Sequence, residues 1–170
     1  MRIVTLLLPV ALTALLAGSA LAQITYVTTL SGANEVPAVV TPATGSATVV
    51  LNAAQTQLSV SVNFANLVGT YSASHIHGPA AVGTNGGVKW GFIGTPAGWV
   101  FSNANHDGVL NNFLVTGITP TDVANLNAEL FYVNVHSSQF PGGELRGQLK
   151  VANVVPTRPS TWGRIKGLYR

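Results

Sequence analysis

Residues 57–64, Gln-Leu-Ser-Val-Ser-Val-Asn-Phe, alternate between polar and apolar side chains. Successive side chains of a β-strand point to opposite faces, so this period of two is typical of a strand with one buried and one hydrated face. Turn-forming clusters of Gly, Pro and Asn separate this stretch from similar runs. The pattern predicts an all-β fold, an antiparallel sandwich or barrel. The other runs, rich in Val, Thr, Leu and aromatic residues, are 24–30, 45–51, 88–93, 109–116, 130–136 and 144–151.

One short segment, 121–127, has helical character. Thr119 or Thr121 could cap its N-terminus, and Pro120 suits an early helical position. We expect a short crossover turn between strands there. The 170 residues are enough for one domain of ordinary size with short appendages.

The composition excludes several classes of protein. Hydrophobic residues make up 47% of the chain and charged residues only 8%, the opposite of an intrinsically disordered chain. The sequence has no cysteine, which excludes disulfide scaffolds, thiolate metal sites and cysteine nucleophiles. Phosphate-binding loops, dinucleotide fingerprints and nucleophile elbows are also absent, so we expect a non-enzymatic protein.

The N-terminal residues 1–22 have the pattern of a signal peptide. Arg2 precedes an apolar run over 3–16, and Ala20-Leu21-Ala22 fits the small-x-small cleavage rule. A membrane anchor is the alternative, but the run is shorter than the roughly 20 residues that a span needs. The pattern predicts a mature chain that starts at Gln23. We expect it to be secreted or extracytoplasmic, in a periplasm, on a cell surface or in the medium.

The C-terminal residues differ in character from the predicted domain over 23–151. A linker with two prolines is expected at 152–159, followed by a basic amphipathic tail over 160–170. The tail is either a frayed end or a sorting or anchoring segment. Residues 23–156 hold three cationic and five acidic side chains, a net charge of −2, so nucleic-acid binding is not expected. A protein or envelope-surface partner, or self-association, fits the low charge.

The histidines are the best candidates for a functional site. His75 and His77 are two residues apart, which on a strand places both imidazoles on one face. His136 ends a later predicted strand and could approach the pair across the sheet. Three imidazoles can bind copper, zinc, iron or nickel. The alternative is that they are hydrogen-bonded structural residues.

Two charged residues in the last predicted strand are candidates for a supporting role. Glu144 and Arg146 are two apart, so we expect both on one strand face, where they would form an ion pair that braces the last hairpin beside the histidines.

Four stretches of the sequence form distinct motifs. They are Leu-Ser-Gly-Ala-Asn-Glu-Val-Pro at 30–37, Ser-His-Ile-His-Gly-Pro at 74–79, Tyr-Val-Asn-Val-His-Ser at 132–137 and Pro-Gly-Gly-Glu-Leu-Arg-Gly-Gln-Leu at 141–149. In this order they resemble the motifs of the CHRD domain, the module named for its repeats in chordin, and the resemblance covers about residues 24–150. It implies an extracellular Greek-key β-sandwich of immunoglobulin-like or superoxide-dismutase-like type and little about activity.

The histidines are also similar to the copper ligands of copper–zinc superoxide dismutase. That likeness implies that His75 and His77 are a strand pair of ligands and His136 a late ligand. Four histidines cannot fill both a copper and a zinc site, and the disulfide is missing. The leading hypothesis is therefore a secreted binding module that holds one copper or zinc ion. A dismutase-like copper redox enzyme and a metal-free structural or self-associating surface protein are the alternatives.

Overall fold

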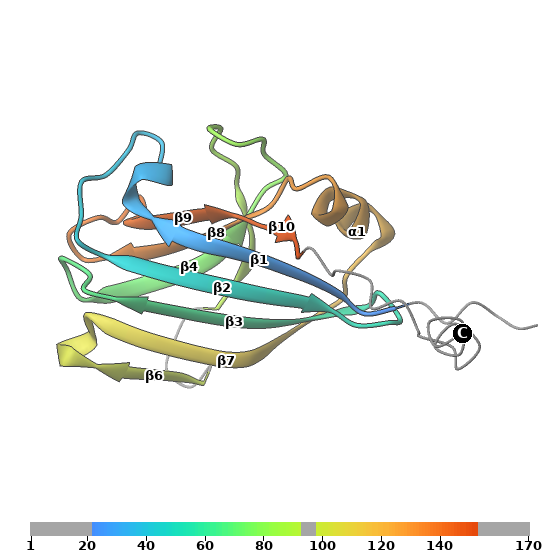
Figure 1. Ribbon diagram of the computed structural model, residues 1–170, viewed down its shortest axis with the longest axis horizontal. Helices are drawn as coiled ribbons and strands as arrows, with labels where there is room; N and C mark the ends of the chain where they lie inside the picture. Colours follow the sequence, from blue (N-terminus) through green and yellow to red (C-terminus); the bar gives the residue numbers. More distant parts are fainter. Residues whose placement is uncertain (1–21, 93–97, 153–170) are drawn as a thin grey trace, which may run out of the picture.

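The computed structural model describes residues 22–92 and 98–152 (Figure 1). The predicted signal peptide, apart from its last residue, lies outside the described residues. So does the predicted tail, together with all but the first residue of its linker. The strands and helices are β1 (Ile24–Ser31), η1 (Gly32–Asn34), β2 (Thr44–Leu51), β3 (Gln57–Ala65), β4 (Tyr71–His77), β5 (Val88–Gly91), β6 (Trp99–Ser102), η2 (Asn103–Asn105), β7 (Asp107–Thr116), α1 (Pro120–Asn127), β8 (Tyr132–Ser137), β9 (Leu145–Gln148) and β10 (Lys150–Val151).

The ten strands form one antiparallel sheet, which confirms the all-β prediction. Their order is β5-β4-β8-β9-β1-β2-β3-β7-β6, and β10 pairs with β1. The hairpin-connected strands β1, β2 and β3 lie side by side, and β9 returns after a long connection to lie next to β1. This spatial order resembles that of a Greek key, but a Greek key consists of four consecutive strands, and here β4 to β8 lie between β3 and β9 along the chain. Instead of two separate sheets, the structure has a single sheet that is continuous through the pair Ser31 and Arg146 of β1 and β9.

The sheet curls so that its two halves face each other across the core. The ring of Phe64 on β3 stacks on that of Tyr71 on β4, with centroids 5.5 Å apart, although the two strands are not neighbours in the sheet. Trp99 on β6 also packs on Tyr71, at 5.0 Å. The apolar side chains of the alternating stretch that predicted β3 are all buried, and they are Leu58, Val60, Val62 and Phe64.

The helix α1 begins where the sequence predicts. The Thr119 hydroxyl accepts a hydrogen bond from the Asp122 backbone N–H, and the Asp122 carboxylate accepts one from the Thr119 backbone N–H, so the two form a capping box. Lys89 on β5 forms an ion pair with Asp122, at 2.6 Å. Within residues 22–92 and 98–152, no helix has the length and apolar character needed to cross a bilayer.

The half of the sheet formed by β4, β8 and β9 has two different faces. Its inner face is apolar, with Ile76, Val133 and Val135 completely buried in the core. Its outer face carries the polar alternate residues of the same strands. All six residues of β8 are buried, because the loop after β1 and the loop after β4 contact this outer face. In Figure 1 both loops project from the same side of the molecule.

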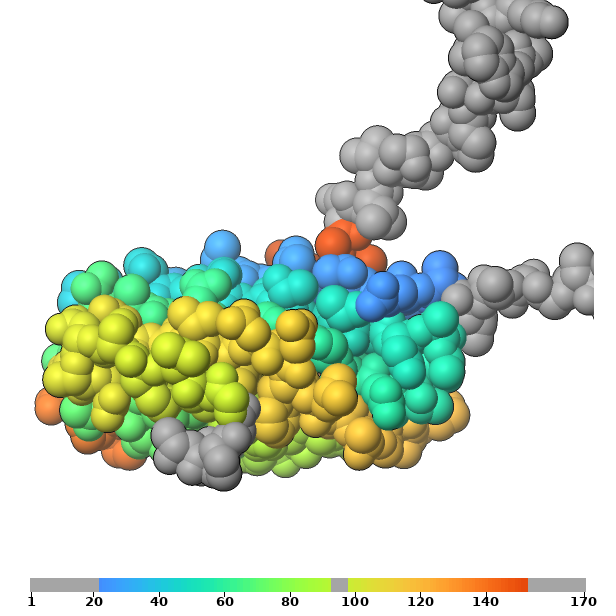
Figure 2. All heavy atoms as spheres, turned by 90° about the horizontal axis from the view of Figure 1, so that it is seen from below, coloured from blue at the N-terminus to red at the C-terminus, as the bar shows by residue number. Residues whose placement is uncertain are grey.

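In Figure 2 the described residues form one continuous body, with β6 and β7 together on the face seen from below.

A matched pair of leucines tests this arrangement. Leu58 on β3 is completely buried, whereas Leu114 on the neighbouring strand β7 is 63% exposed. We expect Leu58→Ala to lower the free energy of unfolding by about 2–5 kcal/mol, because it leaves a cavity between the two halves. Leu114→Ala should change it by less than about 1 kcal/mol. Urea denaturation measures both, and equal losses would contradict the assignment of the inner face.

Candidate functional site

Strands β4 and β8 bring the three predicted histidines together. Ala73 pairs with His136 and His75 with Asn134, so all three imidazoles lie on the outer face. The ring nitrogens that could bind a metal all lie within 4.8 Å of one another. His75 Nδ1 and His136 Nε2 are 3.0 Å apart. The fourth histidine, His106, lies elsewhere and hydrogen-bonds to the carbonyl of Leu67.

Two backbone carbonyls fix how the rings are protonated and oriented. His77 Nδ1–H donates to the carbonyl of Gly86 and His136 Nδ1–H to that of Pro141, both at 3.0 Å. Since a carbonyl can only accept, the Nε2 atom of each ring is left with a free lone pair. His136 Nε2 accepts from His75 Nδ1–H, whereas His77 Nε2 is buried and has no partner. Metal-binding histidines are held in this way, by a carbonyl at the second ring nitrogen.

The three imidazoles are neutral at pH 7. Burial, together with the nearby His136 and His77 rings, lowers the pKa of His75 to about 4. Burial likewise lowers the pKa of His136 and of His77, and for His77 it outweighs the opposing effect of the bond to Gly86. A metal ion binds the neutral imidazole, so the cluster is in the form that a ligand set requires.

The dimensions of the cluster fit one small ion after a small adjustment. Imidazole nitrogens bind zinc at about 2.0–2.1 Å, so two nitrogens on one ion are at most about 4.2 Å apart. His75 Nδ1 and His136 Nε2, 3.0 Å apart, are within this limit. The ligand atoms of the three histidines lie up to 4.8 Å apart, so the widest of these distances must shorten by some tenths of an ångström. His75 can free Nδ1 for a metal by moving its proton to Nε2. His75 and His77 are partly exposed, which leaves the ion a route from solvent.

Tyr132 joins the histidines to Arg146. Its ring stacks on His77 with centroids 5.1 Å apart, and the Arg146 guanidinium carbon lies 3.6 Å from the centre of the same ring. Arg146 is only 2% exposed. It donates to the Asn85 side chain at 2.9 Å and to the carbonyl of Thr84 at 2.6 Å. The loop 84–86 therefore holds both Arg146 and His77.

The expected ion pair between Glu144 and Arg146 does not form among the described residues. Glu144 lies in the turn before β9, where the alternation of a strand does not apply, and its carboxylate points away from Arg146. It accepts hydrogen bonds from the hydroxyls of Ser137 and Thr41 and from the backbone N–H of Val68. Glu144 thus ties the end of β8 to two loops, while Arg146 ties β9 to a third.

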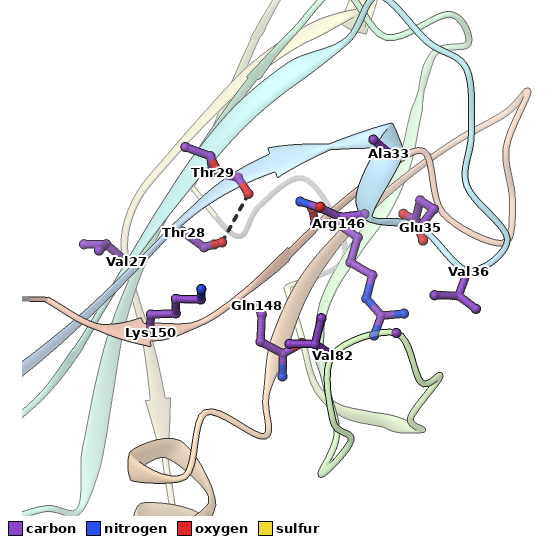
Figure 3. Close-up of a pocket in the computed structure, with 12 residues that line it drawn as sticks. Val27, Thr28, Thr29, Ala33, Glu35, Val36, Val82, Arg146, Gln148 and Lys150 are labelled. Atoms are coloured by element: carbon purple, nitrogen blue, oxygen red, sulfur yellow. Dashed lines mark hydrogen bonds between the residues drawn. The ribbon is translucent and has the colours of Figure 1, made fainter.

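A groove of about 480 Å³ runs along the outer face of β1 and β9, beside the cluster (Figure 3). Figure 3 shows Arg146 reaching between Glu35 and Val82, with Gln148 and Lys150 following it along the same wall. None of the three clustered histidines lines this groove. The groove and the histidine cluster are thus neighbouring features that share Arg146.

Several residues around the cluster were not predicted as part of the site. Tyr132 and Asn134 alternate with His136 on one face of the stretch 130–136. This alternation is the sequence feature that could have identified them as neighbours of His136. Glu35 accepts a hydrogen bond from the Asn134 side chain, and Asn34 donates to the backbone carbonyl of Arg146. Both come from the loop after β1, and which loop would cover the face could not be inferred from residue spacing.

Glu144 offers a test of the buried network. Glu144→Leu removes an acceptor shared by three donors, and an unpaired buried polar group costs about 1–3 kcal/mol. We expect it to lower the free energy of unfolding by at least about 2 kcal/mol. Glu144→Gln keeps one carbonyl oxygen and should lose less. Urea denaturation distinguishes them, and equal stability of the two variants would contradict the role of the carboxylate as an acceptor.

The comparisons with known proteins agree with the motifs. The family model of the CHRD domain matches residues 26–149, which include every residue of the site. No curated protein matched the chain, and no solved structure did. The match covers β1 to β9 together with the loops that cover the outer face. On this match the chain belongs to the CHRD domain family.

Proposed function

We propose that the chain is a secreted, non-enzymatic CHRD-domain binding module that holds one copper or zinc ion through His75, His77 and His136. The observation that carries the proposal is His77 Nε2, a buried nitrogen with no hydrogen-bond partner on a member of the histidine cluster. A buried polar atom without a partner costs free energy. A bound ion would remove this cost.

The surroundings of the cluster support the proposal. The carbonyls of Gly86 and Pro141 hold two rings with Nε2 free, so little conformational freedom would be lost when an ion binds. The nitrogen-only donor set suits copper and zinc. Glu144 and Arg146 would act as supporting residues, since they fasten the loops that carry or face the ligands.

A metal titration tests the proposal. We expect the metal-free chain to bind about one Cu²⁺ or Zn²⁺ per molecule, and the midpoint of thermal unfolding to rise with metal concentration because the ion binds only the folded state. Calorimetry, with metal analysis after dialysis, measures stoichiometry and affinity.

The histidines themselves provide matched controls. His75→Ala/His77→Ala should lose the binding, whereas His106→Ala, which removes a histidine outside the cluster, should keep it. Circular dichroism checks that each variant is folded. Absence of binding by the folded wild type would overturn the metal site and leave a structural or self-associating surface protein. Equal binding by all variants would show that the ion sits elsewhere.

A dismutase-like copper enzyme is the second candidate, because a buried positive charge lies near His77. The Arg146 guanidinium packs on the ring of Tyr132, and His77 stacks on the same ring. A positive charge near a metal can attract an anionic substrate. Among the described residues there is no second group of three metal-binding side chains that could form a separate zinc site. Copper-dependent turnover of superoxide that disappears in a folded His77→Ala variant would favour the enzyme over the passive module.

Secretion has its own test. If residues 1–22 are a signal peptide, expression in a host that processes such signals will yield a protein whose N-terminal residue is Gln23. N-terminal sequencing or intact mass measures this, with fractionation to locate the product. A protein that retains Met1 and remains in the cytoplasm would contradict secretion without affecting the metal proposal.

A further inference from the structure

Glu35 and Asn134 meet beneath the turn that precedes β9. Both are nearly inaccessible, with 7% and 3% of their surface exposed. Asn134 Nδ2–H donates to Glu35 Oε2 at 3.2 Å. The remaining oxygen of each group, Glu35 Oε1 and Asn134 Oδ1, is buried without a partner. Among the described residues these two oxygens and His77 Nε2 are the only such side-chain atoms.

The two unpartnered oxygens lie next to the same point. A Cβ atom built on Gly143 would be 2.5 Å from Asn134 Oδ1 and 2.6 Å from Glu35 Oε1. The two oxygens therefore lie against the same side of the Gly143 backbone, which covers them. Any side chain at position 143 would collide with both, so the glycine is required for this approach, and its φ of +130° favours glycine as well.

Two oxygen acceptors in such a place repel each other unless one carries a hydrogen. An ionised carboxylate and an amide carbonyl can only accept, whereas a protonated carboxyl has one O–H to donate. A proton on Glu35 Oε1 would let it donate to Asn134 Oδ1 while Asn134 Nδ2–H donates to Oε2. We propose that Glu35 is held as a neutral carboxylic acid, joined to the Asn134 amide by two hydrogen bonds, and forms a buried proton-binding site.

The charged groups around Glu35 are consistent with this state. Arg146 on β9 favours the carboxylate, but its guanidinium is held by Asn85 and Thr84. Burial outweighs the attraction of Arg146 and the bond from Asn134, and raises the pKa of Glu35 to about 7. The carboxylate of Glu144, the residue after Gly143, is directed at Ser137, Thr41 and Val68, and His75, opposite Asn134 on β4, is neutral.

Loss of this proton would loosen two segments at once. An ionised Glu35 would face the carbonyl oxygen of Asn134 and be drawn towards Arg146, so one of the two hydrogen bonds would open. Glu35 lies in the loop after β1, which together with the turn 139–143 lines a cavity of about 250 Å³. Pro141 of that turn holds His136. The site is thus a pH-dependent fastening between a covering loop and the sheet, and it does not depend on metal binding.

Carbon-13 NMR of the glutamate carboxyl carbons in the full chain tests the proposal directly. We expect the Glu35 signal to titrate with a midpoint near 7, to disappear in Glu35→Gln, and to persist in Glu129→Gln, which changes an exposed glutamate. A midpoint above about 5.5 supports the neutral acid, since ordinary glutamates in proteins titrate near 4.2. A midpoint below this value would overturn it.

Thermal unfolding gives a second readout. Between the ordinary glutamate pKa of 4.5 and a folded-state value of about 7, the folded chain holds a proton that the unfolded chain has released. Rising pH therefore destabilises the wild type across this window. In Glu35→Gln, the new side-chain amide would donate to Asn134 Oδ1 at every pH. The compared quantity is the unfolding midpoint of this variant minus that of the wild type. We expect this difference to be at least about 3 °C larger at about pH 8 than at about pH 5. If this difference in unfolding midpoint is the same at both pH values, the proposal is overturned. If the variant does not fold, the NMR titration of the wild type alone decides.

Discussion

Strand β8 is buried on both faces, and most of the site follows from this constraint. One face supplies Val133 and Val135 to the core, so the other must bring Tyr132, Asn134 and His136 into a second buried layer. Polar groups withdrawn from water need partners. Loops from three distant parts of the chain provide them: the loop after β1, the loop after β4 and the turn before β9. The need of these buried polar groups for hydrogen-bond partners thus sets both the positions of the loops and the orientation of the histidines.

The regular part of this arrangement could be predicted from the sequence. The alternation at 57–64 gives both the strand and its buried face, because side-chain direction in a strand depends only on position. The same argument placed His75 beside His77 and made His136 their neighbour once β4 and β8 paired. It failed for Glu144, which lies in a turn where alternate residues do not share a face. The short strand β6 was not predicted either, since its four residues follow a Gly- and Pro-containing stretch.

The partners of the site residues could not be predicted, for a different physical reason. His77 is oriented by the backbone carbonyl of Gly86, and every residue has such a carbonyl, so no side-chain pattern marks it. Glu35 lies 99 positions from Asn134 in the sequence, and only the curling of the sheet and the path of one loop bring them together. Contacts of this kind depend on tertiary packing. The CHRD match is informative here because its range, residues 26–149, includes each covering segment.

The pairing of β1 with β10 has a mechanical consequence. Tyr26 lies opposite Val151, and the backbone N–H of Ala152 donates to the carbonyl of Thr25, so the chain enters and leaves the domain at adjacent points. Such a unit can be inserted into a longer polypeptide with little disturbance of its host. A pulling force applied through the two ends would first peel the two-residue strand β10 from β1, one hydrogen bond at a time. The layer of histidines on β4 and β8 would carry load only after that pairing had opened.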